Sequence, residues 1–302
     1  MPEPGPKEAL VANSVSGVNF IDVYYRTGLY PTERPAAIGS EGAGTVERVG
    51  SEVTEVKPGD RVVYAMARGS YAEYAVVPAA MLAPIPDDVT FEAAAAVMLQ
   101  GTTAHYLTRS TFLLDNTHTC LVHAAAGGLG TLLVQMAKER GARVIGTVST
   151  EEKARVVRNL GADETILYTQ QDFETEVKRL TNGRGVDVVY DSVGRTTFEK
   201  GLNVLRPRGL MALVGQSSGP VSPIDPATLN QRGSLFMTRP SLAHHLASRE
   251  ELLWRIGDVM SLVKSGRLAI QISATYPLAD AARAHRDLES RATMGKLLLK
   301  IR

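Results

Sequence analysis

The sequence has almost none of the residues that build disulfides or thiolate metal sites. Among its 302 residues there is one cysteine, Cys120, so an intrachain disulfide framework and a cysteine-rich metal cluster are both excluded. Cys120 stands inside an apolar run, and we expect it to be a buried, inert thiol.

Excess charge and long apolar runs are also missing. The 33 basic and 32 acidic residues leave a formal charge of +1, so bulk electrostatics do not favour a polyanionic partner. No apolar run approaches the roughly 18 residues of a membrane helix, and Met-Pro-Glu-Pro-Gly-Pro at the start lacks a signal-peptide pattern. We therefore expect a soluble, cytoplasmic protein that does not bind membranes.

Hydrophobic residues make up 44% of the chain, enough for the cores of two ordinary domains. The first part carries short β-branched runs separated by glycine and proline, which predict strands at 9–15, 42–49, 60–64 and 71–77. An alanine-rich stretch at 91–108 predicts a long helix. The sequence thus begins with a compact, largely β domain.

After Thr119 the pattern changes to strands alternating with helices. Strands are predicted near 119–123, 143–148, 165–168, 186–190 and 210–215. This alternation predicts an α/β fold with a doubly wound parallel sheet, whose ligand lies beyond the carboxyl ends of the strands. Helices are expected at 249–265 and 278–290. A last strand at 296–301 has no partner in that sheet, so we assign it to the first domain.

A glycine-rich turn lies between the first strand and helix of the alternating region. Ala125-x-Gly127-x-x-Gly130 is the dinucleotide fingerprint with alanine in its first position. Gly127 allows close approach to a pyrophosphate, and Gly130 allows the helix to pack on the strand. The helix N-terminus then directs unpaired N–H groups at the phosphates. The alternative is that these glycines serve only the tight packing of the helix on the strand and bind no nucleotide.

The end of the second strand favours NADPH over NADH. An NAD site usually has Asp or Glu about 20 residues past the first glycine. Here Ser149 supplies a hydroxyl and Lys153 a point charge suited to a 2′-phosphate. The alternative is a capping box of Ser149 with Glu152 and a solvated Lys153. The two interpretations are compatible.

Five segments form a recognisable set: Gly17 to Asp22, Tyr24 to Tyr30, His123 to Gly130, Tyr190 to Gly194 and Leu235 to Pro240. Together they resemble the NADPH-dependent quinone oxidoreductases, the zeta-crystallin-like branch of the medium-chain dehydrogenases/reductases. The resemblance implies a GroES-like catalytic domain at 1–100, a Rossmann NADPH-binding domain at 101–239 and a return to the catalytic domain at 240–302. It also implies a homodimer whose cofactor-domain sheets join edge to edge.

The resemblance also implies roles for individual residues. Asn19, Tyr24 and Tyr30 are expected near the nicotinamide and the quinone; for the two tyrosines a purely structural role is the alternative. The expected cofactor residues are Gln100, Thr103, Gly127, Gly128, Leu129, Gly130, Ser149, Lys153, Tyr168, Gly215, Gln216, Ser217, Ser218, Phe236, Met237, Thr238 and Arg291.

No metal site is expected. Asn19 and Ser40, followed by Glu41, stand where zinc-dependent relatives place metal ligands, and they do not provide the three ligands that a catalytic zinc needs. Hydride transfer to a quinone or enone gives a delocalised oxyanion that needs no Lewis acid. Tyr30 or Asn19 is expected to donate a hydrogen bond to that oxyanion, with solvent supplying the proton.

Two other functions compete with quinone reduction. One is a zeta-crystallin-like nucleotide-binding protein with an RNA-binding or structural role, which the near-zero charge does not favour. The other is a truncated isoform of low activity. The family usually begins with about 25 further residues, and without their strands we expect an unpaired sheet edge in the β domain.

Overall fold

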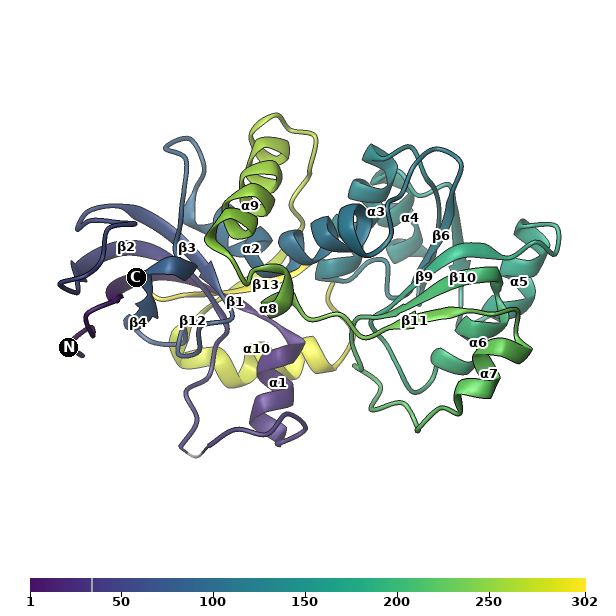
Figure 1. Cartoon of the computed structure of the whole chain (residues 1–302), viewed down its shortest axis with the longest axis horizontal. Coiled ribbons are helices and arrows are strands. Elements are labelled where there is room, and N and C mark those ends of the chain that lie inside the picture. The colour runs from purple at the N-terminus through teal and green to yellow at the C-terminus, as the bar shows by residue number, and fades with distance from the viewer. Residues whose placement is uncertain (34) are drawn as a thin grey trace. The chain divides into compact units, whose positions relative to one another are not determined.

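In the computed structural model, which describes residues 1–33 and 35–302, the chain forms two compact units. The first unit comprises Met1–Thr102 and Leu242–Arg302, and the second comprises Thr103–Ser241. The chain passes from the first unit to the second within the long helix α2 (Phe91–Tyr106), which matches the helix predicted from 91. Figure 1 traces both units by residue number.

The first unit is built on a seven-stranded sheet in the order β12-β13-β1-β2-β3-β5, with β4 pairing with β1 as well. All pairs are antiparallel except β12 with β13. The strands are β1 (Glu8–Val18), β2 (Glu41–Val49), β3 (Arg61–Ala65), β4 (Tyr74–Pro78), β5 (Ala83–Pro84), β12 (Ile272–Pro277) and β13 (Lys296–Lys300). Because β13 pairs with β1, the assignment of the last strand to this domain is confirmed.

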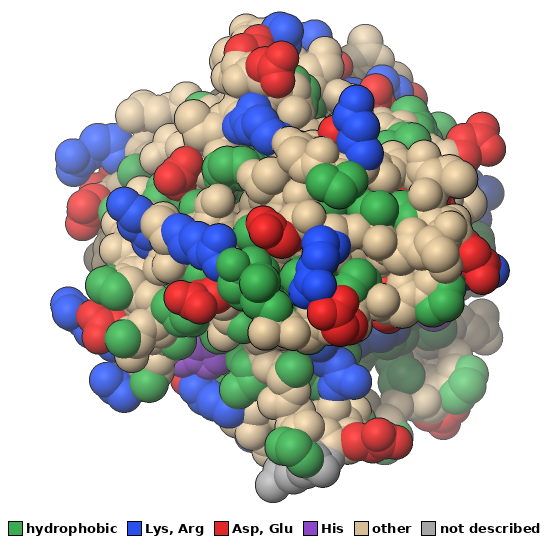
Figure 2. Space-filling view, turned by 90° about the vertical axis from the view of Figure 1, so that its left-hand side faces the viewer, with side chains coloured by type: hydrophobic (Ala, Val, Ile, Leu, Met, Phe, Trp, Pro, Cys, Tyr) green, Lys and Arg blue, Asp and Glu red, His purple; other side chains and the backbone are tan. Residues whose placement is uncertain are grey.

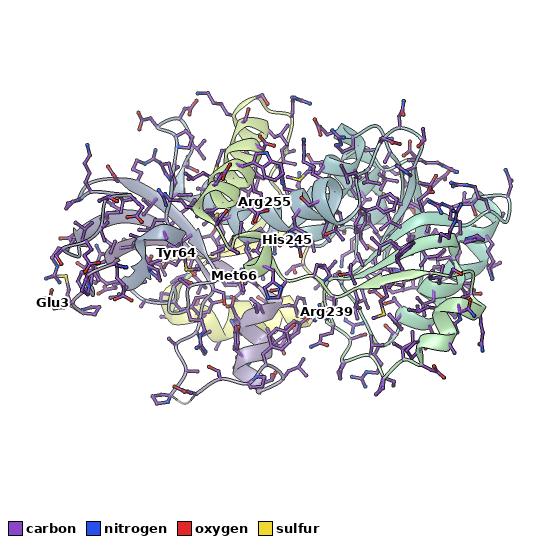
Figure 3. All side chains as sticks on the ribbon, in the orientation of Figure 1. Glu3, Tyr64, Met66, Arg239, His245 and Arg255 are labelled. Carbon is purple, nitrogen blue, oxygen red and sulfur yellow. The ribbon has the colours of Figure 1, made fainter. Side chains whose placement is uncertain are left out.

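Helices pack around this sheet, whose core combines apolar side chains with buried polar ones. The helices are α1 (Phe20–Thr27), α8 (Leu242–His245), α9 (Arg249–Lys264) and α10 (Ala281–Glu289). Tyr64 is buried in the sheet core, where its hydroxyl donates to Asn13 Oδ1 over 2.9 Å. On α9, buried Arg255 donates from Nε to the carbonyl oxygen of His245 over 2.8 Å (Figure 3).

The second unit is a six-stranded parallel sheet in the order β11-β10-β9-β6-β7-β8, the order of the dinucleotide-binding folds. The predicted α/β doubly wound fold is therefore confirmed. Its strands are β6 (Thr119–Val122), β7 (Arg143–Val148), β8 (Glu164–Leu167), β9 (Val186–Asp191), β10 (Leu205–Leu213) and β11 (Phe236–Thr238). The short strand β11 was not predicted, because three residues carry too little periodicity.

The helices of the second unit are α3 (Gly128–Glu139), α4 (Glu151–Asn159), α5 (Phe173–Leu180), α6 (Phe198–Asn203) and α7 (Pro226–Gln231). Helices α3 and α4 pack against β6, β7 and β8, whereas α5 and α6 pack against each other and against β8, β9 and β10 (Figure 1). Gly141 and Gly161 follow α3 and α4 with φ of +82° and +104°, the left-handed conformation that ends helices at glycine. Cys120 is fully buried in β6, and burial raises the pKa of its thiol to about 12.

Candidate active site

The glycine-rich turn in the second unit lies between β6 and α3. Ala124 has φ of +51°, and its carbonyl oxygen accepts a hydrogen bond from Gly127 N over 2.9 Å. A Cβ on Gly130 would lie 2.4 Å from Ala124 O, so this glycine lets α3 pack against the turn. The first N–H groups of α3, from Gly128 onward, have no acceptor within the helix and form a site suited to an anion.

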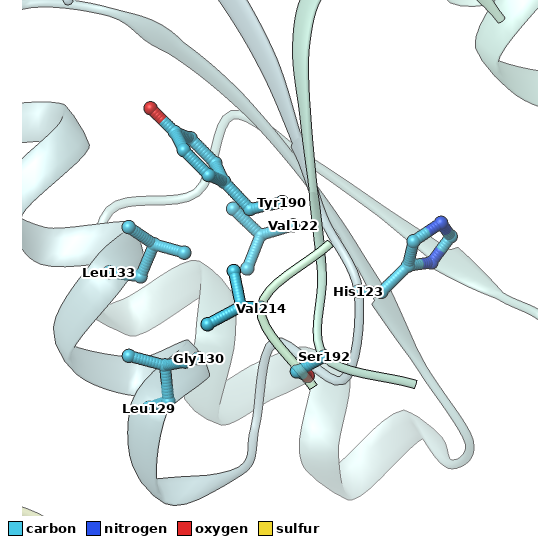
Figure 4. A pocket seen from close by; sticks show the side chains of 8 residues that line it. All are labelled: Val122, His123, Leu129, Gly130, Leu133, Tyr190, Ser192 and Val214. Atoms are coloured by element: carbon cyan, nitrogen blue, oxygen red, sulfur yellow. The ribbon is translucent and has the colours of Figure 1, made fainter. Parts of the chain in front are cut away.

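A small pocket opens beside this turn. Leu129, Gly130 and Leu133 of α3 line one side, across from side chains at the ends of β6, β9 and β10 (Figure 4). His123 contributes to the lining, but its imidazole points away from α3 and packs edge-on against Phe173, with ring centroids 4.7 Å apart. Burial lowers the pKa of His123, which is therefore a neutral core histidine.

The residues expected around a 2′-phosphate come from three segments that meet at the ends of β7 and β8. Val148 and Leu167 are partners in the sheet, so Ser149 and Tyr168 follow neighbouring strand ends. Lys153 lies in the first turn of α4, where the positive end of the helix dipole disfavours a cation. Burial lowers the pKa of Lys153, and an adjacent anion would relieve both costs.

The proposed capping box of Ser149 with Glu152 is wrong. The N-cap of α4 is Thr150, whose Oγ1 accepts from Lys153 N over 3.2 Å. The sequence offered two adjacent hydroxyl residues, and the helix begins one residue later than the pattern suggested. Ser149 instead uses its carbonyl oxygen to accept from Thr169 Oγ1 over 2.9 Å.

The segment Gly215 to Ser218 follows β10 and is fixed against the loop after β9. Ser218 donates from its backbone N to Val193 O over 2.8 Å, and a Cβ on Gly215 would lie 2.7 Å from Ser192 O. Buried Asp191 organises the facing loop, because its carboxylate accepts from Val193 N and Gly194 N. Gln216 and Ser217 lie between these anchors, half-buried.

The last expected cofactor residues of the second unit lie on or near β11. Phe236, Met237 and Thr238 pair with β10, and the Phe236 side chain is 62% exposed on the outermost strand. Thr103 is buried in α2.

In the first unit, Asn19 is the centre of a buried polar cluster. Its Oδ1 accepts from Lys296 Nζ over 2.8 Å and from Gln100 Nε2 over 3.1 Å. Its Nδ2 donates to Glu41 Oε2 over 2.8 Å and to Gly17 O over 3.3 Å. Both amide hydrogens are therefore used within the protein, which argues against Asn19 as the oxyanion donor that the sequence suggested.

Glu41 and Lys296 form a fully buried ion pair beside Asn19, with Nζ 2.5 Å from Oε2 and relative side-chain exposures of 0% and 2%. The other carboxylate oxygen, Oε1, accepts from Leu99 N in α2 over 2.5 Å. A Cβ on Gly17 would lie 2.0 Å from Glu41 Oε2, so the pair is accommodated because this position is glycine. Glu41 stands beside a predicted site residue in the sequence, whereas Lys296 opens a strand 255 residues away and carries no local signal.

Asp22 is the second buried carboxylate of the cluster. It accepts from Ser40 Oγ over 2.7 Å and from Asn19 N over 3.0 Å, and burial raises its pKa to about 6. A hydrogen-bonded chain continues outward from Asp22 through Tyr71, whose Oη lies 3.3 Å from Oδ2, to His285 Nε2 over 3.0 Å. Since Arg26 can only donate to His285 Nδ1, His285 Nε2 carries the hydrogen and donates to Tyr71.

Tyr24 and Tyr30 lie together on one side of α1. Gly28, with φ of +79°, ends the helix and turns the chain back, so that Tyr30 N donates to Tyr24 O over 3.1 Å. The two rings are 5.1 Å apart between centroids, and Tyr24 is nearly buried while Tyr30 is half-buried.

Arg291 of the same unit is exposed and has φ of +60°.

Among the described residues, no group of three or more His, Cys, Asp and Glu side chains is arranged to hold a metal ion. The place where a zinc ligand set was considered is occupied by Asn19, Ser40 and Glu41, with the Lys296 ammonium already bonded to two of them. A second cation would be repelled there, so these residues do not fit zinc. None of the helices formed by the described residues is long and apolar enough to cross a bilayer.

Together, the parallel dinucleotide-type sheet and the antiparallel unit with its buried cluster define a two-domain dehydrogenase/reductase. The family model described as "Alcohol dehydrogenase GroES-like domain" matches residues 5–87, and that described as "Zinc-binding dehydrogenase" matches residues 128–251.

Individual relatives show which family of dehydrogenases/reductases the chain resembles. A quinone oxidoreductase of Pseudomonas aeruginosa is 48% identical over 98% of this chain and 92% of its own. The Escherichia coli quinone oxidoreductase solved in complex with NADPH is 45% identical, with a TM-score of 0.97 over 100% of this chain and 94% of its own. A 2-haloacrylate reductase of Burkholderia is 42% identical over 98% and 91%. The chain belongs to the quinone oxidoreductase family of the medium-chain dehydrogenases/reductases.

Proposed function

We propose that this protein is a zinc-independent NADPH:quinone oxidoreductase that reduces quinones or related activated enones. The observation that carries the proposal is the likeness, over nearly the whole chain, to quinone oxidoreductases, one of them solved with NADPH. The relative named for 2-haloacrylate reduction supports the inclusion of activated alkenes.

The second unit holds the cofactor in this proposal. The pyrophosphate binds at the start of α3, where helix N–H groups lack acceptors, and it contacts Gly127, Gly128, Leu129 and Gly130. Ser149, Lys153 and Tyr168 surround the 2′-phosphate, supported by the position of Lys153 in the first turn of α4. The other residues proposed to contact the cofactor are Thr103, the loop from Gly215 to Ser218, the strand from Phe236 to Thr238, Gln100 and Arg291.

The first unit acts on the substrate. When bound, the nicotinamide supplies a hydride. Tyr30, packed on Tyr24, donates a hydrogen bond to the oxyanion that develops on the quinone, and solvent supplies the proton. Asn19 does not donate to the substrate but holds Gln100, because its own amide is fixed by Lys296 and Glu41.

The assembly in this proposal is a cytoplasmic homodimer joined through β11. This strand ends the six-stranded sheet and exposes Phe236, an apolar side chain that a second copy would cover. Light scattering of the wild-type protein and of Phe236→Asp tests the dimer, since the charge should yield a monomer.

RNA binding is not favoured. On the face of the molecule shown in Figure 2, Lys and Arg side chains are interspersed with Asp and Glu and do not form a continuous basic surface.

The proposal is tested by following NADPH consumption with 1,4-benzoquinone and 9,10-phenanthrenequinone, beside an RNA shift assay at varied salt. We expect quinone-dependent oxidation of NADPH and no specific RNA shift. An RNA shift without quinone-dependent NADPH oxidation would contradict the proposal.

A further inference from the structure

Gln100 carries an acceptor that the protein does not use. Its Oε1 is buried and has no hydrogen-bond partner among the described residues, although its Nε2 donates to Asn19 Oδ1 over 3.1 Å. An unpaired buried acceptor destabilises a folded chain, so it is expected where a ligand supplies the donor.

The orientation of the Gln100 amide is determined by its neighbours. Asn19 Oδ1 can only accept, so Gln100 must face it with Nε2 and turn Oε1 the other way. Asn19 is itself fixed, because Lys296 can only donate and must meet Oδ1, whereas the Glu41 carboxylate can only accept and must meet Nδ2.

The buried ion pair therefore specifies the orientation of the Gln100 amide, acting through Asn19. Lys296 has little freedom to move, since Glu41 holds its ammonium and the backbone at Gly17 closes in on both side chains. Glu41 also accepts from Leu99 N, the residue before Gln100 in α2, so the same carboxylate fixes the position of the helix turn that carries Gln100.

We propose that Lys296 is a positioning residue for the cofactor: through Asn19 it fixes Gln100 so that Oε1 accepts a hydrogen bond from the carboxamide N–H group of the nicotinamide. This inference rests on the proposed function, which places Gln100 near that ring. A carboxamide provides a neutral N–H donor, and Oε1 provides the matching acceptor.

The test compares binding of NADP⁺ with binding of its 3-acetylpyridine analogue, which lacks the carboxamide N–H donor. Calorimetric titration of both ligands gives the ratio of their dissociation constants without any turnover. One hydrogen bond of ordinary strength makes this ratio about tenfold in the wild-type protein.

Three variants test whether the ratio depends on the orientation of the Gln100 amide in proteins that still fold. Gln100→Leu should bring the ratio close to one. The double variant Glu41→Gln with Lys296→Met removes both charges and should also lower the ratio, as should Asn19→Leu, which leaves the ion pair intact. Lys300→Met, an exposed lysine of the same strand, is the matched control and should keep the wild-type ratio.

Two results would overturn the inference. A ratio near one in a wild-type protein that binds NADP⁺ and reduces quinone shows that Gln100 is not the acceptor. A wild-type ratio in folded double-variant and Asn19→Leu proteins shows that Lys296 does not set the orientation. Absence of NADP⁺ binding and of quinone reduction would instead refute the proposed function, and the inference with it.

Discussion

The glycine turn of the second unit and the buried cluster of the first unit are built in opposite ways. The turn uses backbone groups from Ala124 to Gly130, all within one short segment. The cluster uses side chains of Asn19, Glu41 and Lys296, which the fold brings together from both ends of the sequence. The turn is thus suited to bind any diphosphate of the right shape, whereas the cluster depends on each side chain being present.

The largest effect is expected when one charge of the cluster is removed. Lys296→Met leaves Glu41 buried without its counter-ion, which should destabilise the protein by about 3–5 kcal/mol. Adding Glu41→Gln should restore most of that loss. Urea unfolding of the two single variants and the double variant measures the coupling, and equal stabilities for Lys296→Met and wild type would contradict the account.

Asp22 should make the stability of the first unit depend on pH. Burial raises its pKa from 3.8 to about 6, so between these values the folded chain keeps a proton that the unfolded chain has lost. The contribution of Asp22 to stability is therefore greatest below pH 4 and falls as the pH rises through 6, by about 3 kcal/mol.

This contribution is isolated by measuring unfolding free energies from pH 4 to 7 for wild type and Asp22→Asn. The difference between the two curves should slope by about 1.4 kcal/mol per pH unit at most. The exposed Asp87→Asn is the control and should run parallel to wild type. Parallel curves for Asp22→Asn as well would show that this carboxyl does not titrate in the range.

In the turn, two glycines should respond differently to alanine. A Cβ on Gly130 meets backbone atoms at 2.4 and 2.7 Å, so Gly130→Ala should cost about 1–3 kcal/mol. A Cβ on Gly127 meets its nearest atom at 3.2 Å, and Gly127→Ala should cost about 1 kcal/mol or less. Thermal unfolding compares them, and equal losses would show that the close packing at Gly130 carries no special cost.

The smallest expected effect is that of metal removal. Because Lys296 already supplies the positive charge beside Asn19 and Glu41, dialysis against a strong chelator should leave quinone reduction unchanged. A loss of activity that added zinc restores would contradict the proposed mechanism.

The difference between the glycine turn and the buried cluster explains which features could be predicted from the sequence. The parallel sheet and the fingerprint turn follow local patterns, and the structure confirms both. The partner of Asn19 could not be predicted, since Lys296 stands at the start of an ordinary strand and becomes buried only when β13 pairs with β1. The cap of α4 was misplaced by one residue because Ser149 and Thr150 have equivalent hydroxyls, and only the backbone geometry distinguishes them.

The central claim is that the two regions divide the work, with recognition of the cofactor's 2′-phosphate in the second unit and turnover in the first. It is tested most directly by measuring the NADPH dissociation constant and kcat for Lys153→Ala and Tyr30→Phe. Lys153→Ala should weaken NADPH binding about ten- to 150-fold, with NADH binding and kcat nearly unchanged. Tyr30→Phe should lower kcat on the order of 100-fold at unchanged NADPH affinity. If both variants change affinity and turnover together, or if Lys153→Ala weakens NADH as much as NADPH, the claim is contradicted.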